Sequence, residues 1–471
     1  MSSSSQASER IRSLLDDNSF AEIGALVAAR NTDFGLKQAP TPSDGVVTGY
    51  GTIDGRLVYV YSQDVSVLGG SVGEMHARKI ARVYELATKT GAPVIGLIDS
   101  AGLRLQEATD ALNAFGEIYA AQVNASGVIP QITAIFGNCG GGLALIPAIT
   151  DFTFMETKSA LYVNAPNVLA GNYKEKCDTS SAGWQSTETA NVDVVADENE
   201  LIAQIRALAA FLPSNNEDTD SFTECTDSLN RACPNLDALT GDPAAVAAQI
   251  ADGGVFFETK RGYAREMVTG FIRMNGAAVG LIGNRTKTED GKESYDAALT
   301  ANGCEKAADF IRFCDAFDIP VLTLTNVKGY GANKCDERRV ARGAARLAYA
   351  LASATVPKVN LVMETAFGSA YTVMNSRALG ADMTFAWPGA QIGTMDADLA
   401  AKILAADGDA SAQAECAQAY RKLQNNVESA AAHGYVDAVI EPSETRKYVI
   451  GALEMLFTKR EDRPARKHGT V

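Results

Sequence analysis

The sequence predicts two α/β domains of the same fold, each built on a sheet whose parallel strands are joined by crossover helices. The chain has 471 residues, which is too many for one compact core and indicates two or three domains. Short continuous apolar runs, typical of strands buried on both faces, alternate with segments of helical periodicity. The second half of the chain then repeats the order of the first, which indicates a duplicated domain.

The repeat is visible in the spacing of matching residues. In the first half these landmarks are Lys79, Pro93, Gly102 and Pro130, and in the second half they are Lys306, Pro320, Gly329 and Pro357. In both halves the lysine precedes the first proline by 14 residues, and the glycine and the second proline follow that proline by 9 and 37 residues. Agreement at three spacings, with matching residue types, predicts two domains of one fold.

In the first half, the hydrophobic pattern predicts a helical opening, a hairpin, two crossover helices and two buried strands. The expected elements are a helical segment over 8–30, a strand–turn–strand segment over 45–60, helices over 75–90 and 107–123, and strands over 93–98 and 129–136. The last strand leads into a glycine stretch over 137–142. The apolar run 143–149 then indicates that a helix begins after the glycines.

The second half predicts the same order of elements. They are a strand–turn–strand segment over 270–283, helices over 306–317 and 337–354, and strands over 320–325 and 357–366. Between the halves, residues 213–235 are rich in Asn, Asp, Glu, Ser and Thr, which is typical of a linker or an exposed loop. We therefore expect an N-terminal domain over residues 1–225 and a C-terminal domain over residues 236–471.

The composition narrows the possible partners and the compartment. A net charge of −15 argues against a nucleic-acid partner, which requires a basic face. The sequence shows neither the apolar core of a secretory signal nor a run of about 18 apolar residues, so we expect a cytoplasmic protein. The eight cysteines form no Cys-x-x-Cys pair and there are three histidines, so neither a metal site nor a histidine-based triad is expected.

The glycine stretch 137–142 is the strongest candidate for a ligand site. Glycines let a ligand approach the backbone amides, and a helix that begins there adds partial positive charge. The alternative is a tight turn that simply requires positive φ. The repeat favours a site, because each half has one turn after its central strand and another after the next strand, at Gly102 and Gly141–Gly142 and again at Gly329 and Ser369–Ala370. Amides that converge from two turns form an oxyanion hole, which stabilises an enolate or a tetrahedral intermediate.

Short motifs with a fixed order extend over residues 40–455. In the first half they are Tyr61-Ser62-Gln63-Asp64, Gly69-Gly70-Ser71, Asp99-Ser100-Ala101-Gly102 and Asn138-Cys139-Gly140-Gly141-Gly142. In the second half they are Arg273-Met274-Asn275-Gly276, Thr355-Val356-Pro357-Lys358-Val359, Ala386-Trp387-Pro388 and Gly434-Tyr435-Val436-Asp437. Together they resemble the biotin-dependent acyl-CoA carboxyltransferase family, and the number and order of the motifs carry the resemblance.

The resemblance implies a fold and an assembly. Each domain would have a crotonase-like ββα-spiral fold, and the active site would lie at a dimer interface, with acyl-CoA on the N-terminal domain of one subunit and biotin on the C-terminal domain of another. The expected assembly is a homo-hexamer, a trimer of dimers. The implied partners are a biotin carboxyl carrier protein and either a biotin carboxylase subunit or a membrane decarboxylase subunit. Biotin carried on a partner and coenzyme A as part of the substrate are implied, and no metal is implied.

The resemblance also implies roles for individual residues. Gly102, Gly141 and Gly142 would hold the thioester oxygen of acyl-CoA as an enolate, and Ser369 and Ala370 would hold the ureido oxygen of biotin. In this scheme carboxybiotin releases CO2, the biotin nitrogen removes the α-proton of acyl-CoA, and the CoA enolate attacks CO2, so no side-chain base is needed. The residues expected to contact the substrates are Lys79, Arg104, Gly329, Tyr371 and Thr372.

Two turns depart from the family pattern. Gly368-Ser369-Ala370 stands where the family has Gly-Gly-Ala, which keeps the amide but adds a Cβ that restricts φ at Ser369. Lys328-Gly329-Tyr330 stands where the family has Pro-Gly-Phe.

Some side chains have a second interpretation. Ser100 and Ser369 are possible nucleophiles, but neither motif has a histidine nearby to activate it. Cys139 is a possible thiolate or a small packing residue. Lys79 is equally a phosphate ligand or a solvated lysine, and His76 is most simply a packing or helix-surface residue.

We therefore predict a carboxyltransferase subunit that moves CO2 between biotin and the α-carbon of a short acyl-CoA, with propionyl-CoA/methylmalonyl-CoA or acetyl-CoA/malonyl-CoA as the substrate pair. The sequence leaves open the acyl length and the direction of the reaction. The alternatives are a biotin-independent crotonase-like hydrolase or isomerase, and a non-catalytic scaffold of a carboxylase complex.

Overall fold

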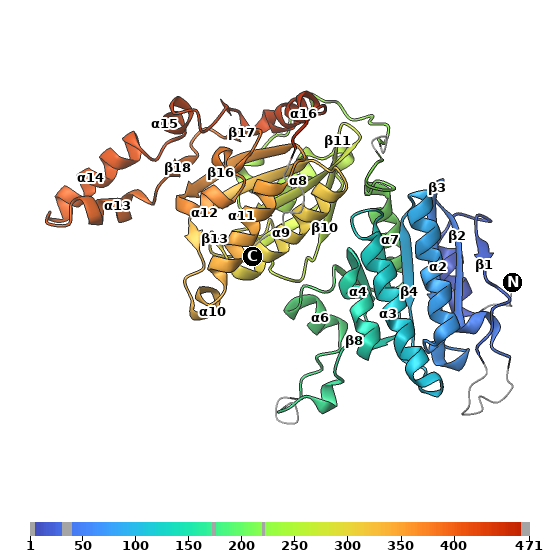
Figure 1. Cartoon of the computed structure of the whole chain (residues 1–471). Helices are drawn as coiled ribbons and strands as arrows, with labels where there is room; N and C mark the ends of the chain where they lie inside the picture. Colours follow the sequence, from blue (N-terminus) through green and yellow to red (C-terminus); the bar gives the residue numbers. More distant parts are fainter. Residues whose placement is uncertain (1–4, 31–39, 172–175, 219–221, 463–471) are drawn as a thin grey trace. The chain divides into compact units, whose positions relative to one another are not determined.

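In the computed structural model, the chain divides into two units, Met1–Ser221 and Phe222–Val471, which are called here the N-terminal and the C-terminal unit. The structure describes residues 5–30, 40–171, 176–218 and 222–462. Each unit has its own cluster of buried apolar side chains, as expected of a domain (Figure 1). The division falls within the polar segment 213–235.

The N-terminal unit is built on a seven-stranded sheet with the order β1-β2-β3-β4-β5-β7-β9. The pairings among β1, β2 and β3 are antiparallel, and the later pairings are parallel. The strands are β1 (Ala21–Ile23), β2 (Val46–Ile53), β3 (Arg56–Gln63), β4 (Val94–Ile98), β5 (Gln131–Ile135), β7 (Phe152–Glu156) and β9 (Val194–Ala196). The hairpin and both buried strands predicted for this half are confirmed.

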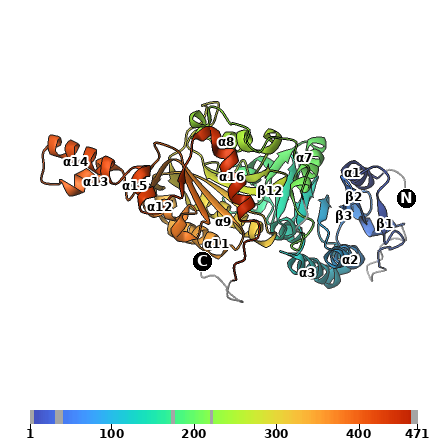
Figure 2. The ribbon, with the colours of Figure 1, turned by 90° about the horizontal axis from the view of Figure 1, so that it is seen from above.

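Helices cover both faces of this sheet (Figure 2). The crossover helices α2 (Glu74–Thr90) and α3 (Ala108–Ala125) pack on each other, and α1 (Gln6–Leu14) packs on α7 (Glu198–Phe211). α2 buries the apolar stripe that its periodicity predicts, and it ends at Gly91, whose φ of 64° is the left-handed conformation that commonly closes a helix. The helices predicted over 75–90 and 107–123 are confirmed.

The helical opening predicted over 8–30 is wrong beyond Leu14. α1 ends there, and the chain continues into the edge strand β1. The reason lies at Asp16, whose carboxylate accepts hydrogen bonds from the amides of Gly55 and Asp54 in the turn between β2 and β3. The bond from Gly55 is the largest of several effects that lower the pKa of Asp16. These hydrogen bonds hold Asp16 at the β2–β3 turn, so α1 ends before another helical turn and the chain continues along the sheet edge.

The C-terminal unit repeats the same sheet. Its main path is β10-β11-β12-β14-β16-β17-β19, again with antiparallel pairings among the first three strands and parallel pairings after them. The strands are β10 (Phe256–Thr259), β11 (Met267–Met274), β12 (Ala277–Asn284), β14 (Val321–Val327), β16 (Lys358–Phe367), β17 (Met383–Ala386) and β19 (Ala438–Val439). The two sheets correspond strand by strand, which confirms the predicted duplication.

The helices of the C-terminal unit correspond in the same way. α9 (Ala301–Ala316) and α11 (Val340–Ser353) are the crossovers and pack on each other, whereas α8 (Pro243–Ile250) and α16 (Thr445–Met455) lie on the opposite face (Figure 2). The helix predicted over 306–317 is confirmed. The helix predicted over 337–354 is interrupted, because a separate turn, α10 (Lys334–Glu337), precedes α11.

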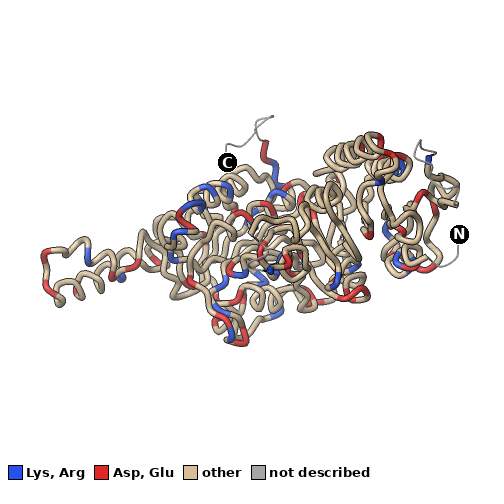
Figure 3. The backbone as a smooth tube through the Cα atoms, turned by 90° about the horizontal axis from the view of Figure 1, so that it is seen from below, with Lys and Arg blue, Asp and Glu red and all other residues tan. Residues whose placement is uncertain are grey.

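Charged residues of both signs occur throughout the chain. Acidic and basic residues are interspersed along both units, so the net charge of −15 is spread over the chain (Figure 3). In the part of the chain that the structure describes, no helix is both long enough and apolar enough to cross a membrane.

Candidate active site

Two turns meet at the carboxyl ends of β4 and β5 in the N-terminal unit. β5 is followed by β6 (Asn138–Gly140), the 3-10 turn η4 (Gly141–Ala144) and α4 (Leu145–Ile149). The amide of Ser100 donates to the carbonyl of Asn138 at 3.1 Å, which ties the turn after β4 to the turn after β5. A Cβ placed on Gly102 would lie 3.8 Å from the carbonyl oxygen of Gly140. The structure therefore brings together the two turns that the sequence predicts to form the first hole.

The glycines of these turns are required for different reasons. Gly102 and Gly141 have φ values of 95° and 64°, which side-chain-bearing residues rarely adopt. A Cβ on Gly141 would meet no heavy atom within 4 Å, so its backbone conformation, and not a lack of space, demands glycine. A Cβ on Gly142 would lie 3.1 Å from the hydroxyl oxygen of Tyr119, which donates to the carbonyl of Gly142.

The amides predicted to form the first hole are not equally available. The amide of Gly102 donates to the hydroxyl of Ser100 at 3.0 Å, and that hydroxyl donates to the carbonyl of Gly70 at 2.7 Å. Gly102 is buried, whereas Gly142 is exposed and lies in the first turn of a helical segment, where amides lack an acceptor within the helix. Gly142 is therefore the better placed donor, and Gly102 reaches a ligand only by exchanging its bond with Ser100.

The C-terminal unit has equivalent turns at the carboxyl ends of β14 and β16. β14 is followed by β15 (Gly329–Tyr330), and β16 is followed by α12 (Gly368–Val373). The positive φ of the second turn, 60°, falls on Gly368, and Ser369 lies inside the helix. The expected restriction of φ at Ser369 is therefore absent, because the glycine that the turn requires is kept.

The remaining predicted residues of this unit lie on the same turns. Ser369 and Thr372 are exposed, Ala370 is buried, and Tyr371 is half-buried. Burial raises the pKa of Tyr371 to about 12, so its hydroxyl stays protonated near neutral pH. The roles predicted for these residues and for Gly329 stay predictions.

Lys79 is used inside the N-terminal unit. Its ammonium donates to the carbonyls of Ser43 and Val46 at 3.0 and 2.5 Å, and burial lowers its pKa to about 8. In the C-terminal unit Lys306 has the same part, with bonds of 2.9 Å to the carbonyls of Lys260 and Tyr263. The duplication thus extends to a buried lysine that holds a loop, and these contacts favour a structural role over phosphate binding for Lys79.

Arg104 is also held by internal partners. Its guanidinium is 1% exposed and pairs with the carboxylates of Asp44 and Glu107 at 2.6 and 2.9 Å. It also donates to the carbonyl of Ser71 at 2.7 Å. These contacts favour a structural role, because little of the guanidinium is left to face a ligand.

None of the side chains considered as nucleophile or base near the first hole is suited to that work. Ser100 is buried and bonded as described above, and burial raises the pKa of the Cys139 thiol, so Cys139 is a packing residue. His76 is fully buried, with Nδ1 2.9 Å from the carbonyl of Asp44 and Nε2 3.2 Å from the side-chain nitrogen Nε2 of Gln63. Because a carbonyl only accepts, Nδ1 carries the proton, and burial lowers the pKa of His76 to about 3.

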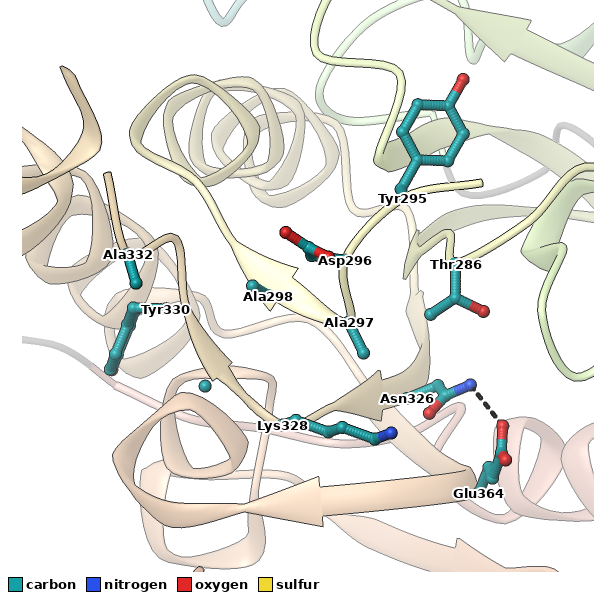
Figure 4. A pocket seen from close by; sticks show the side chains of 11 residues that line it. Thr286, Tyr295, Asp296, Ala297, Ala298, Asn326, Lys328, Tyr330, Ala332 and Glu364 are labelled. Atoms are coloured by element: carbon teal, nitrogen blue, oxygen red, sulfur yellow. Dashed lines mark hydrogen bonds between the residues drawn. The ribbon is translucent and has the colours of Figure 1, made fainter. Parts of the chain in front are cut away.

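A cavity of about 580 Å³ opens at the carboxyl ends of β12, β14 and β16, within the size range of small-molecule sites (Figure 4). Its wall is formed by Thr286, Tyr295, Asp296, Ala297, Ala298, Asn326, Lys328, Gly329, Tyr330, Ala332 and Glu364. Gly329 thus faces a cavity, whereas Ser369 and Ala370 are not among the lining residues.

The sequence motifs indicated no functional role for Asn326, Glu364 or Asp296, and Lys328 stood out only as a departure from the family pattern. The available signal was Glu364, which is the one acidic residue, and the one exposed residue, of the buried strand Lys358–Phe367. A charge in such a strand indicates either an ion pair or a site.

Comparison with known proteins agrees with this architecture. The carboxyl transferase domain model matches residues 3–471. The alpha subunit of methylmalonyl-CoA decarboxylase from Veillonella parvula is 42% identical, over 99% of this chain and 92% of its own length. The propionyl-CoA carboxylase beta chain from Saccharopolyspora erythraea is 42% identical, over 99% of this chain and 90% of its own.

Solved structures give the same result. Transcarboxylase 12S, described as a hexamer with hydrolysed methylmalonyl-coenzyme A bound, superposes with a TM-score of 0.92 and 38% identity, over 98% of this chain and 92% of its own. A single-chain long-chain acyl-CoA carboxylase matches with a TM-score of 0.77 at 23% identity, over 95% of this chain and 45% of its own, which concerns the fold alone.

The fold and its duplicated turns thus define an enzyme of two crotonase-like domains. The chain belongs to the carboxyl transferase domain family, as a carboxyltransferase subunit of the biotin-dependent type.

Proposed function

We propose that this subunit transfers CO2 between biotin on a partner protein and the α-carbon of a short acyl-CoA, with propionyl-CoA and methylmalonyl-CoA as the substrate pair. The observation that carries this proposal is the pair of equivalent turns, one pair in each unit, at the carboxyl ends of the matching strands. The choice of substrate pair rests on relatives named for methylmalonyl-CoA and propionyl-CoA. Acetyl-CoA and malonyl-CoA are the second candidate pair.

The N-terminal unit would take the acyl-CoA. The exposed amide of Gly142, and that of Gly102 after its bond with Ser100 is exchanged, would face the thioester oxygen and stabilise its enolate form. Gly141 would shape the turn through its positive φ. His76, Lys79 and Arg104 would keep this region rigid, because each is held by internal hydrogen bonds.

The C-terminal unit would take the biotin ring, with the amides of Ser369 and Ala370 directed at the ureido oxygen. The cavity beside Gly329 supports a ring site in this unit, because its volume suits a small ring and its wall offers both donors and acceptors, but Ser369 and Ala370 do not line it, so their role rests on the equivalence of the turns alone. When bound, biotin supplies the nitrogen that carries CO2 and accepts the α-proton. The chain itself supplies the amides that orient the reacting groups and stabilise their negative oxygens.

We also propose a cytoplasmic homo-hexamer that works with a biotin carrier protein and with either a biotin carboxylase or a membrane decarboxylase subunit. The hexamer is argued from transcarboxylase 12S, and the partners from relatives that are named as subunits of larger enzymes. Native mass measurement tests the assembly, for which six copies of the 49.7 kDa chain give about 300 kDa.

The proposed reaction is tested with free biotin and purified protein. Methylmalonyl-CoA, malonyl-CoA and glutaconyl-CoA are each offered, and CO2 release is followed with and without biotin. We expect biotin-dependent release, fastest with methylmalonyl-CoA. CO2 release without biotin would instead identify a biotin-independent crotonase-like enzyme, release of free CoA without CO2 would identify a hydrolase, and binding of CoA esters without any turnover would identify a scaffold.

A further inference from the structure

The cavity of the C-terminal unit holds charged groups of both signs. Lys328 lies directly after β14, Glu364 lies in β16, and Asp296 lies in the segment before α9. All three are exposed. In Figure 4 the Lys328 side chain extends toward Asn326 and Glu364. The site therefore offers a cation and a carboxylate to one ligand.

Glu364 is held in place by buried side chains. The side-chain amide of Asn326 donates to the Glu364 carboxylate at 2.9 Å. Asn326 is 1% exposed, and its own backbone amide donates to the side-chain oxygen of Asn284 at 2.8 Å. The side-chain amide of Asn284, which is 2% exposed, donates back to the carbonyl of Asn326. This chain of bonds crosses β12, β14 and β16, so the three central strands together fix the position of one carboxylate.

The Lys328 ammonium is available to a ligand. Within the described ranges, no carboxylate forms an ion pair with the Lys328 ammonium. The buried Lys306 of the same unit differs, because its ammonium donates to two backbone carbonyls. Lys328 is exposed and lines the cavity, so its ammonium can meet a ligand oxygen there.

The charges select the chemistry of the ligand. A simple anion would be attracted by Lys328 but opposed by Asp296 and Glu364, and a simple cation would be opposed by Lys328. A ligand that carries an anionic oxygen and an N–H donor satisfies Lys328 and Glu364 at the same time. A cyclic urea with a carboxylate on one nitrogen and a hydrogen on the other has these two features.

We propose that Glu364 and Lys328 are positioning residues for the biotin ring: Glu364 accepts a hydrogen bond from a ring N–H, and Lys328 pairs with the carboxylate in transfer. This inference rests on the proposed function, since it assigns the cavity to the same ring. It assigns separate tasks to the two residues. Glu364 acts whenever the ring is bound, whereas Lys328 acts only while the carboxylate is on the ring.

The test uses biotin methyl ester, which lacks the tail carboxylate, with the full-length protein. Its affinity is measured by calorimetry, and its kcat and KM are measured in the decarboxylation of methylmalonyl-CoA. The variants are Glu364→Gln, Lys328→Met and Lys328→Arg. Lys334→Met and Glu337→Gln are matched controls, because both residues are exposed and lie outside the cavity lining.

We expect Glu364→Gln to weaken binding and raise KM about tenfold, the size of a lost charge-assisted hydrogen bond. Lys328→Met should lower kcat about ten- to hundredfold and leave the affinity for the uncarboxylated ring within about twofold, and Lys328→Arg should recover most of the rate. The controls should match the wild type.

Control-like binding by Glu364→Gln, or a Lys328→Met variant that loses affinity and rate together, would overturn the assignment. If wild-type protein binds the ester but releases no CO2 from any acyl-CoA, the proposed reaction fails while the binding arm still decides the role of Glu364. If the wild type is active and the variants equal the controls, the reaction stands and only this inference fails.

Discussion

At the scale of single residues, the polar side chains beside the predicted first hole are bonded within the fold, so the proposed chemistry rests on the backbone amides. His76, Lys79 and Arg104 are buried, and each is bonded to carbonyls or carboxylates of its own unit. A buried polar group without such partners would cost a few kcal/mol, which explains why these residues come with dedicated acceptors. The sequence places them beside the predicted site, but only the tertiary contacts show that they are occupied.

His76 should make the fold sensitive to acid. Its pKa is lowered from 6.5 to about 3 by burial, so the unfolded chain takes up this proton as pH falls below about 6.5 while the folded chain does not. Its contribution to stability is therefore present above pH 6.5 and is lost between about 6.5 and 3, on the order of a few kcal/mol in full. Thermal unfolding from pH 7 to 4 should show a steeper loss for the wild type than for His76→Gln. Equal slopes would contradict a neutral, buried His76.

Lys306 should make stability depend on pH in the alkaline range. Burial is the largest effect that lowers its pKa, from 10.5 to about 7, so between these values the unfolded chain binds a proton that the folded chain lacks. Its contribution to stability should rise with pH across that window. Denaturant unfolding at pH 7 and 9 should show a smaller gain for Lys306→Met than for the wild type. An identical gain in both would show that Lys306 stays charged in the fold.

Gly142 is the residue whose change should affect turnover most directly. A valine there brings a side chain to 3.1 Å from the Tyr119 hydroxyl and covers the exposed amide, and loss of one such donor typically lowers rates about 10²–10³-fold. Gly183→Val is the control, because a Cβ at Gly183 would meet no heavy atom within 4 Å and Gly183 lies in α6 (Ala182–Glu188), outside the turns that follow β4 and β5. Native mass should be unchanged in both variants. Full activity of Gly142→Val would show that the first hole is misassigned.

At the scale of elements, the turn–helix junctions explain which sequence departures matter. Gly368 carries the positive φ of the second turn, and Ser369 follows it inside α12. The substitution that distinguishes this turn from the family pattern therefore falls at a position that tolerates a side chain. The sequence alone did not reveal this, because the three residues of the turn look equivalent until their φ values are known.

Gly368→Ala and Ser369→Gly should consequently differ in stability. Alanine at a φ of 60° costs about 1–2 kcal/mol, and its Cβ would lie 3.2 Å from the carbonyl of Thr394. Ser369→Gly restores the family residue and should shift stability by less than about 1 kcal/mol. Urea unfolding of both variants measures the difference. An equal loss of unfolding free energy in the two variants would show that the strained position of the turn is not Gly368.

At the scale of the whole molecule, spacing and periodicity predicted the duplicated sheets because both are local in sequence. Buried strands show as apolar runs, crossover helices show as a 3.6-residue period, and the repeat fixes their order. The cavity was not predicted, since Asn326, Lys328, Glu364 and Asp296 come from separate segments that only the folded sheet brings together. The prediction of a helix over 8–30 was wrong for the same reason. The end of that helix depends on hydrogen bonds between Asp16 and a hairpin that is distant in sequence.

The central proposal is that backbone amides of the duplicated turns stabilise the negative oxygens of the reacting groups, and that this chain supplies no base. Exchange of the α-hydrogen of propionyl-CoA with deuterium from D2O, followed by mass spectrometry, tests this most directly. We predict exchange only when carboxybiotin is present, because loss of its CO2 leaves the nitrogen base that removes the α-proton, and a loss of about 10²–10³-fold in Gly142→Val. Exchange that proceeds at full rate without biotin would reveal a side-chain base and contradict the account.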